Sequence, residues 1–456
     1  MLQELEVLTG KFVGTVWGMP LVGLLVSAGI IFTVYFGFPQ LTLFKHAIDI
    51  IRGKFDDPND PGEISHFQAL TTALSATVGL GNIAGVAVAV ATGGPGAVFW
   101  LWVAGFIGMT TKFTEVTLSL TYRETSEKGS VHGGPMYVIK NGLPKKLGFL
   151  GGAYAFFVIL SSFGAGNMFQ SNQMASVLNY STGMPEWLSG LIFAALAALV
   201  LIGGIKRIGQ VTEKLVPAMV CLYLFGALFI IFNNLDQLIP MFGLVLKSAF
   251  TGHAASGAFA GVVVKEVIIQ GIRRATFSSE AGMGSAAMAH SAAKSSPIQE
   301  GIVALLEPFI DTIVVCTITA MAILLSGVWD DAGIAGTEMT AAAFATAMGP
   351  WGEYLVTLVV TMFAFSTIIS WSYYGEQGTV YLFGEKAITP YRVIFVVFIF
   401  IGTLANLPIV LNISDGVYGL LAIPNMIACF MLMPKVKQVL TDYRTKLKSG
   451  EMKAFK

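Results

Sequence analysis

The sequence predicts an all-α polytopic membrane protein with about eleven transmembrane helices. Hydrophobic residues make up 55% of the 456 residues and charged residues only 12%, and the mean hydropathy is +0.72. Apolar runs of roughly 20 residues, the length that a helix needs to cross about 30 Å of hydrocarbon, recur along the whole chain. The expected spans are 12–37, 66–92, 97–121, 150–179, 186–204, 210–232, 257–288, 298–326, 351–383, 391–407 and 411–433.

The basic residues are distributed unevenly between the two sides that these spans define. If the amino terminus is outside, 21 of the 27 Lys and Arg residues fall in inward-facing connections and in the C-terminal tail, whereas only Lys11 and Lys247 lie outside. Cytoplasmic loops of membrane proteins carry an excess of positive charge. We therefore expect a multi-pass protein of the cell (plasma) membrane with its N-terminus outside and its C-terminus in the cytoplasm.

This orientation implies an internal repeat. The span 66–92 runs from inside to outside and the span 257–288 from outside to inside, and each begins a group of five. Two groups of opposite topology form an inverted five-plus-five repeat. The expected divisions are an extra N-terminal helix with a cytoplasmic loop (1–65), a first repeat (66–232), an outer loop (233–256), a second repeat (257–433) and a basic cytoplasmic tail (434–456).

Signal-peptide, redox and catalytic features are not evident. Glu4 and Glu6 precede the first apolar run, which has no small-residue cleavage site, so we expect this run to remain as a helix. Cys221, Cys316 and Cys429 fall inside expected spans and are interpreted as small buried hydrophobes. No phosphate loop, zinc helix or nucleophile elbow is present. We expect no enzyme and no cofactor; a catalyst assembled from distant residues and an uncoupled channel are the alternatives.

Two of the apolar segments are interrupted near their middle by glycine and polar residues. The interruptions are Ser-Ala-Thr-Val-Gly-Leu-Gly-Asn at 75–82 and Thr-Phe-Ser-Ser-Glu-Ala-Gly-Met-Gly-Ser at 276–285. Hydrocarbon cannot satisfy opened backbone, so such segments survive only where they line a cavity or bind something. Paired breaks in two similar halves are typical of transporters. The alternative is that the glycines only permit close helix packing.

The first interruption has the groups that bind a cation and an anion. Gly79 and Gly81 relax the backbone, while Thr77 offers a hydroxyl and Asn82 an amide oxygen. Sodium accepts such oxygens together with freed carbonyls. Amides at the start of the outer half-helix would attract a carboxylate. We therefore expect both an ion and a substrate here.

The second interruption repeats this chemistry. Phe277 is expected to wall the cavity, and Ser278 and Ser279 to bind water or substrate. Glu280 would be costly in lipid and must face a partner or water. Its role, structural or in substrate contact, is left open by the sequence.

Two further spans contribute candidate substrate contacts. In the fourth span, Gln170 is expected as a polar contact with Phe169 beside it as a hydrophobic wall; hydrogen bonding between helices is the alternative. In the ninth span, Trp371 is expected to restrict the pocket to a small side chain, or else to serve only in packing.

Glu307 and Asp311 lie at i and i+4 of the eighth span and so occupy one helical face. Burial makes pairing or protonation necessary, which raises proton coupling as an alternative mechanism. We expect structural pairing, to Arg273 or Arg274.

The block Gly-Gly-Pro-Gly-Ala-Val-Phe-Trp-Leu-Trp-Val-Ala-Gly at 93–105 resembles the signature of the alanine or glycine:cation symporters, the sodium:alanine symporter family, with Leu101 where Met is commoner. His-Gly-Gly-Pro-Met-Tyr at 132–137 and both interruptions also match. The resemblance covers nearly the whole chain. It implies the amino acid-polyamine-organocation superfamily and a leucine-transporter-like inverted repeat. The implied function is sodium-coupled import of small neutral amino acids, alanine and glycine, by alternating access, and the alternative is a proton-coupled symporter.

The resemblance also implies two sodium sites, with Na⁺ as the coupling ion. Thr77 and Asn82 would lie near an ion that touches the substrate, and the carbonyl of Val78 would reach a second ion. The second site would be completed from one face of the ninth span, with Ser75 adjacent to it. The residues of that face are Phe363, Ser366 and Thr367, at i, i+3 and i+4. Hydroxyls bonded back to their own helix are the alternative for the last two.

Overall fold

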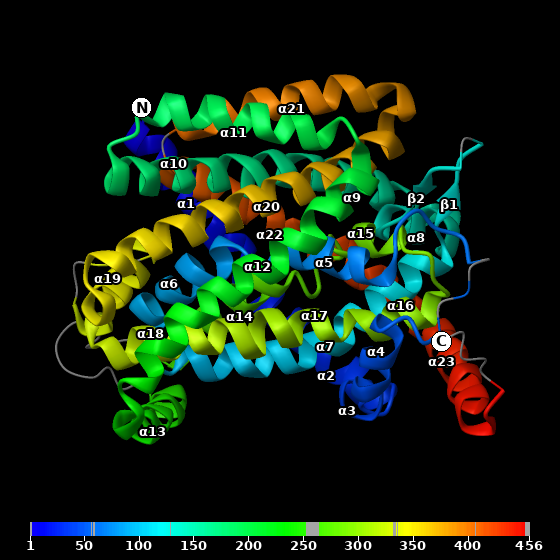
Figure 1. The fold of residues 1–456 in the computed structure, drawn as a ribbon. Helices are drawn as coiled ribbons and strands as arrows, with labels where there is room; N and C mark the ends of the chain where they lie inside the picture. The colour runs from blue at the N-terminus through cyan, green and yellow to red at the C-terminus, as the bar shows by residue number, and fades with distance from the viewer. Residues whose placement is uncertain are drawn as a thin grey trace.

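A computed structural model describes residues 2–55, 57, 60–127, 129–251, 264–331, 334, 336–405 and 407–451. The described chain is helical apart from one two-residue antiparallel pair, β1 (Glu124–Thr125) and β2 (Val131–His132). Most helices lie roughly parallel in one bundle (Figure 1). The fold class expected from the sequence is confirmed: the protein is an all-α, multi-pass membrane protein.

The described part of the first half of the chain contains twelve α-helices. They are joined by π-helical turns at Gly81–Gly85 and Gly164–Met168 and by a 3₁₀ turn at Lys145–Leu147. The bounds are α1 Leu2–Val16, α2 Met19–Tyr35, α3 Pro39–Thr42, α4 Phe44–Ile51, α5 His66–Thr77, α6 Val86–Gly93, α7 Ala97–Thr121, α8 Pro135–Gly142, α9 Phe149–Phe163, α10 Phe169–Thr182, α11 Glu186–Leu201 and α12 Gly204–Phe232.

The described part of the second half contains eleven more. A π-helical segment lies at Phe309–Cys316, and 3₁₀ turns lie at Val328–Asp330 and Glu385–Ala387. The bounds are α13 Leu235–Thr251, α14 Val264–Ser279, α15 Ala287–Ser291, α16 Pro297–Ala304, α17 Leu306–Pro308, α18 Thr317–Ser326, α19 Gly336–Met348, α20 Pro350–Phe383, α21 Ile388–Thr403, α22 Leu407–Leu420 and α23 Ala422–Ser449.

By length and composition, eight helical stretches of the described chain are able to cross a membrane, or nine if α5 and the segment Gly81–Gly93, which meet at 50°, count as one broken span. These correspond to nine of the expected spans. The fifth expected span is the shorter α11, of 16 residues. The seventh is divided into α14, a turn and α15, and its first residues, 257–263, lie outside the described part.

Two segments differ in detail from what the sequence predicts. The stretch 233–256, expected as an outer loop, contains the 17-residue helix α13. This helix packs on α7, where the Trp100 indole N–H donates to the Ala249 carbonyl at 3.1 Å. Cys221, expected to be buried, is exposed on α12, whereas Cys316 and Cys429 are buried; all three are free thiols.

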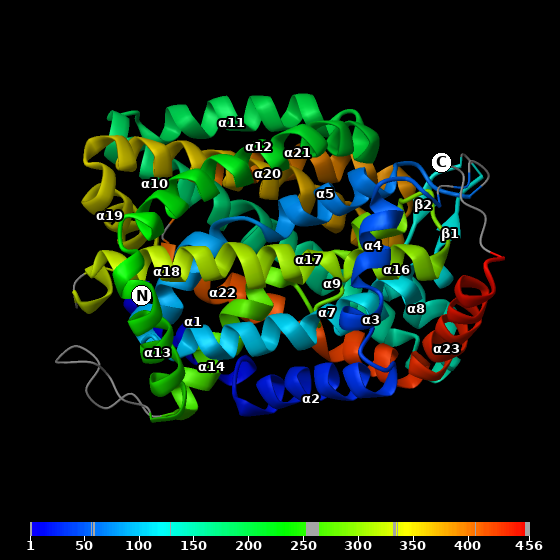
Figure 2. The same ribbon diagram turned by 60° about the horizontal axis from the view of Figure 1, so that its bottom comes forward.

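The two broken helices pass through the interior of the bundle (Figure 2). One end of the bundle is formed by β1, β2, α8 and the end of α23, and the other by α13 and α19. α11 and α21 lie side by side along one edge in both views. The breaks in α5 and α14 are therefore enclosed by helices from both halves of the chain.

The first break follows directly from local sequence. α5 begins with a capping box in which Ser65 and Gln68 exchange side-chain and backbone hydrogen bonds at 3.2 Å. The helix ends at Val78, whose ψ of 89° leaves the helical region. A Cβ on Gly81 would lie 3.3 Å from the Ser278 Cα. The glycine therefore allows the two breaks to touch.

The second break is a tight turn between α14 and α15. Glu280 has a φ of 56°, a left-handed conformation that is uncommon for a residue with a side chain. The turn is fixed by hydrogen bonds from the Glu280 amide to the Thr276 carbonyl, at 2.9 Å, and from the Met283 amide to the Glu280 carbonyl, at 3.0 Å. Gly282, two residues later in the same turn, also has a positive φ, of 99°.

Candidate functional site

A small cavity, with a volume of about 20 Å³, lies between the two breaks. Both breaks contribute to its wall, together with α10, α20, α22 and the π-helical turn before α10. Six of the ten expected substrate residues line it: Thr77, Gly79, Gly81, Gln170, Phe277 and Trp371. The other lining residues are Ala76, Leu80, Ala165, Glu280, Thr367 and Tyr418.

Four expected substrate residues lie beside the cavity instead of lining it. Phe169 packs edge-on against Phe277, with ring centroids 6.5 Å apart. Ser279 is buried, and its hydroxyl accepts from the Ala281 amide at 3.4 Å. Asn82 and Ser278 are buried behind the cavity wall, where they meet another helix.

Aromatic rings close one side of the cavity. Tyr418 from α22 contacts both Phe277, at 5.2 Å between centroids, and Trp371, at 5.8 Å. The cavity is therefore bounded on this side by an apolar wall of aromatic rings that pack on one another. The contribution of Tyr418 was missed in the sequence, where a lone Tyr in an apolar span carries no signal that distinguishes it from a packing residue.

A cluster of polar groups surrounds Asp311 behind the first break. The Asp311 carboxylate accepts hydrogen bonds from the Asn82 amide at 2.7 Å, the Ser278 hydroxyl at 2.9 Å and the Thr312 hydroxyl at 2.7 Å. Asp311 is fully buried, and no basic side chain of the described residues pairs with it. A buried carboxylate that only neutral donors surround requires a cation or a proton.

The side-chain oxygens expected to bind the first sodium are already hydrogen-bonded. The Asn82 Oδ1 accepts from the Gly79 amide at 2.8 Å. The Thr77 hydroxyl donates to the Ala73 carbonyl, one turn earlier in its own helix, at 3.2 Å. In this conformation Asp311 is the acidic residue of the cluster.

The residues expected for the second sodium site meet between α5 and α20. The hydroxyls of Thr367 and Ser366 lie 3.0 and 3.3 Å from the Ser75 carbonyl, and the Ser366 hydroxyl also donates to the Phe363 carbonyl at 2.9 Å. The backbone at Gly79 approaches the Thr367 hydroxyl so closely that a Cβ there would lie 2.6 Å from it. Oxygens from both helices are thus gathered at the first break. Val78 is fully buried beside them.

Glu307 has a basic partner, as expected, but the arginine partners predicted for Glu307 and Asp311 were wrong. Arg273 and Arg274 approach Asp415 of α22, at 2.5 and 3.8 Å. Arginine and carboxylate therefore neutralise each other away from the eighth span. The sequence could not show this, because Asp415 lies 142 residues beyond Arg273.

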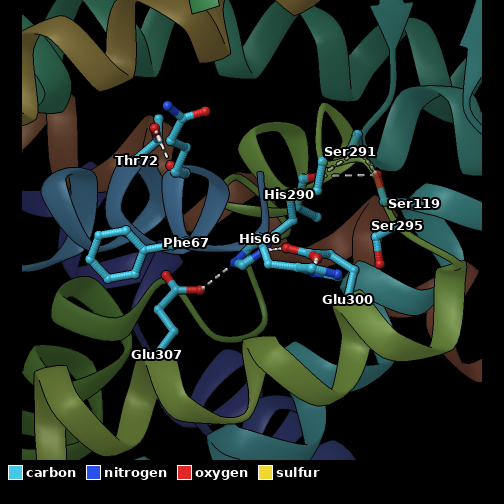
Figure 3. Close-up of polar contacts among 12 residues, drawn as sticks. His66, Phe67, Thr72, Ser119, His290, Ser291, Ser295, Glu300 and Glu307 are labelled. Carbon is cyan, nitrogen blue, oxygen red and sulfur yellow. Dashed lines mark hydrogen bonds and ion pairs between the residues drawn. The ribbon is translucent and has the colours of Figure 1, made fainter. Parts of the chain in front are cut away.

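Glu307 belongs instead to a chain of buried charged groups (Figure 3). Its two carboxylate oxygens lie 3.3 Å from the Lys112 ammonium and 3.4 Å from His290 Nε2. The other ring nitrogen of His290 contacts Glu300 at 2.7 Å, and Glu300 also contacts His66 of α5. This chain ties α5 and α7 to the helices that follow the second break.

A backbone joint reinforces the same connection. The Glu63 amide donates to the Ala292 carbonyl at 2.7 Å, and the Lys294 amide donates to the Ile64 carbonyl at 2.8 Å. The Arg123 guanidinium spans the joint by donating to carbonyls on both sides of it: Pro61 at 2.7 Å, Ser291 at 2.7 Å, Ala293 at 2.8 Å and Ser295 at 3.1 Å. We refer to 61–64 together with 291–295 as the joint.

The described residues contain no group of three or more His, Cys, Asp or Glu arranged to hold a metal ion. The polar clusters that they do form offer hydroxyl, carbonyl, amide and carboxylate oxygens, which are hard ligands of the kind that an alkali cation accepts. Two broken helices around a small cavity are typical of a secondary membrane transporter.

The fold has a counterpart of known structure. The crystal structure of MhsT in complex with L-phenylalanine matches with a TM-score of 0.55 and 15% identity over 84% of this chain and 99% of that chain. This likeness shows the leucine-transporter-like fold.

The family model described as "Sodium:alanine symporter family" matches residues 2–456, and the chain belongs to that family. It is 43% identical to the sodium/alanine symporter AgcS of Methanococcus maripaludis (91% of this chain, 92% of the relative). It is 35% identical to the probable sodium/glutamine symporter GlnT of Bacillus subtilis (100% and 94%) and 32% identical to the amino-acid carrier protein AlsT of the same organism (95% and 91%). The protein is therefore a sodium-coupled amino acid symporter and not an enzyme.

Proposed function

We propose that this symporter imports small neutral amino acids, alanine and glycine, across the plasma membrane by alternating access. The observation that carries the proposal is the cavity between the two breaks, which Phe277, Trp371 and Tyr418 confine on one side. A cavity this limited suits a side chain of one methyl group or none. A relative with 43% identity is named a sodium/alanine symporter, which supports the same substrate class.

The proposed first sodium ion lies at the cluster of Asn82, Ser278 and Asp311, behind the cavity wall. The Asp311 carboxylate would compensate the charge of the bound ion, which the neutral groups of the cluster cannot do. The substrate carboxylate lies toward the opened backbone of 79–82, whose amides carry partial positive charge. Thr77 remains a candidate contact at the same break.

The proposed second sodium ion lies where the Ser75 carbonyl meets Ser366 and Thr367. The carbonyls of Val78 and Phe363 are its further candidate ligands. Binding there holds α5 against α20, so occupancy of the site stabilises one arrangement of the two halves over the other.

For orientation, we propose that the end of the bundle formed by β1, β2, α8 and the end of α23 faces the cytoplasm (Figure 1). Basic residues concentrate in the connections at this end and in α23, as the positive-inside rule requires. The N-terminus is then outside, and the joint closes the path from the cavity to the cytoplasm.

The experiment that tests the function is uptake of labelled alanine by proteoliposomes under an inward sodium gradient, an inward proton gradient or neither. Accumulation that requires sodium is the expected result. Accumulation driven by protons alone would contradict sodium coupling and would direct attention to the buried Asp311 carboxylate, for which the described residues provide no basic partner. No accumulation under any gradient would contradict the proposed function.

A further inference from the structure

Glu280 places a carboxylate at the edge of the substrate cavity. The residue directly follows the end of α14, and its left-handed backbone is held by the turn of the second break. The residue is only 1% exposed and lines the cavity. The position is therefore fixed by backbone geometry and is not a flexible surface charge.

No basic side chain of the described residues forms an ion pair with Glu280. One carboxylate oxygen accepts a hydrogen bond from the Ser285 hydroxyl. Lys112, a buried lysine whose charge acts on Glu280, is itself 3.3 Å from Glu307. A buried carboxylate in this situation is costly unless a cation or a proton neutralises it.

Gln170 provides a second acceptor on the cavity wall. Its amide nitrogen donates to the Ala165 carbonyl at 3.0 Å, which leaves the amide oxygen as the remaining polar group. That oxygen is buried and has no hydrogen-bond partner among the described residues, and the side chain is 4% exposed. Glu280 and Gln170 thus present two acceptors to one cavity that contains no basic residue in its described lining.

We propose that the Glu280 carboxylate and the Gln170 side-chain oxygen receive the α-ammonium group of the transported amino acid. This inference rests on the proposed function, in which the substrate carboxylate is directed to the opened backbone of 79–82. The zwitterion is then oriented by its two charges, and its ammonium group neutralises the carboxylate of Glu280.

The pair also makes the transporter selective for an amino group. A substrate without one would leave a buried carboxylate and a buried amide oxygen unpaired, and sites built to bind a donor reject analogues that lack it. L-Lactate has the size and carboxylate of alanine but a neutral hydroxyl in place of the ammonium group. We therefore expect the unaltered protein to reject L-lactate.

The test is Glu280→Gln, which keeps size and hydrogen bonding but removes the charge. In proteoliposomes with saturating sodium, the half-saturating alanine concentration should rise at least tenfold, because hydrogen bonds to charged groups are the stronger ones. The concentration of L-lactate needed to inhibit the remaining uptake should not rise. The ratio of the lactate concentration to the alanine concentration that half-saturates the transporter should therefore fall. The sodium concentration that gives half-maximal uptake should remain within twofold when alanine is saturating.

Glu115→Gln is the matched control. Glu115 is also buried and accepts from the Gly282 amide and the Asn425 amide, at 2.9 and 2.6 Å, but it does not line the cavity. This variant should keep the preference of the unaltered protein for alanine over lactate. If Glu280→Gln does not fold, Gln170→Met carries the test, since it removes the second acceptor and should raise the half-saturating alanine concentration at least threefold.

An unchanged preference for alanine over lactate in a folded Glu280→Gln protein would overturn the inference while leaving the proposed function intact. A shift in sodium activation without a change in alanine affinity would also overturn it, by making Glu280 an ion ligand. Failure of the unaltered protein to accumulate alanine would instead overturn the proposed function, and the inference with it.

Discussion

Asp311 shows how much a single buried charge contributes to the candidate ion site. It binds three neutral donors on three segments of the chain, and no basic partner is present among the described residues. The neutral groups orient the carboxylate, but they do not compensate its charge. A sodium ion would do both.

Asp311→Asn should therefore raise the sodium concentration required for half-maximal alanine uptake by at least tenfold. Asn has nearly the same shape, and it removes the charge while replacing one acceptor oxygen with an NH₂ donor, to which the neighbouring hydroxyls can adapt by rotating. Sodium activation curves in proteoliposomes measure the effect. Sodium activation that matches that of the unaltered protein would show that Asp311 is not part of the ion site.

The indole ring of Trp371 limits the space in the substrate cavity. The residue is 3% exposed, lines the cavity and packs on Tyr418 and Tyr374. Trp371→Ala should allow larger neutral amino acids such as leucine to compete with alanine, because removing the indole opens space next to the substrate.

Competition by a series of neutral amino acids of increasing size measures the effect of Trp371→Ala. The same change at Trp351, which is 80% exposed, is the control and should leave the series unchanged. A series that is identical for the Trp371 variant and the unaltered protein would mean that Trp371 serves in packing alone.

At the scale of elements, the second break depends on a few residues with unusual backbone. Gly282 has a φ of 99°, and its amide donates to the buried Glu115 carboxylate at 2.9 Å. This hydrogen bond ties the turn to α7. The conformation is one that residues with a Cβ rarely adopt.

Gly282→Ala should lower the free energy of unfolding by about 1–3 kcal/mol, the usual cost of a strained backbone conformation. A Cβ there would also displace Leu25 of α2. The effect is measured by thermal unfolding in detergent, which is monitored through the loss of the monodisperse peak. The expected result is a lower midpoint temperature.

Gly152→Ala is the control for this substitution, since Gly152 lies within helix α9 and a Cβ there would have no neighbour within 4 Å. Ala is the better helix former, so this change should be neutral or slightly stabilising. Equal midpoints for the two variants would show that the turn tolerates a side chain.

For the whole molecule, the joint connects the start of α5 with the residues after α15. The Arg123 guanidinium connects the two segments of the joint, because it donates hydrogen bonds to carbonyls of both 61–64 and 291–295. The buried chain from His66 through Glu300 and His290 lies next to it (Figure 3). In the proposed orientation, a movement that opens the cavity toward the cytoplasm would separate these contacts.

Arg123→Gln should therefore increase hydrogen–deuterium exchange at the amides of Glu63, Ile64 and Lys294 at least tenfold, because the joint loses its charged bridge. The control is Lys140→Gln. Lys140 pairs with Glu124 at the surface, with side chains 50% and 38% exposed, and such pairs contribute little. If exchange is the same in the Arg123 variant and the unaltered protein, the path from the cavity to the cytoplasm is closed at another place.

Much of this organisation could be predicted from the sequence because it depends on local pattern. The composition requires a membrane, the glycine and polar residues at 75–82 and 276–285 mark the breaks, and the block at 93–105 carries the family resemblance. Ser366 and Thr367 lie on the helical face of Phe363 by their i+3 and i+4 spacing from it. Thr77, Gln170, Phe277 and Trp371 were likewise expected near the cavity that they line.

What the tertiary structure decided is the pairing of buried groups. Asp311 meets Asn82 across 229 residues, Arg273 meets Asp415 across 142, and Glu307 takes Lys112 in place of an arginine. Charges and amides in a bilayer accept any partner that packing brings within reach, so residue type does not specify the partner. The sequence by itself thus determined which groups must find partners, and only the packing of the helices determined which partners they found.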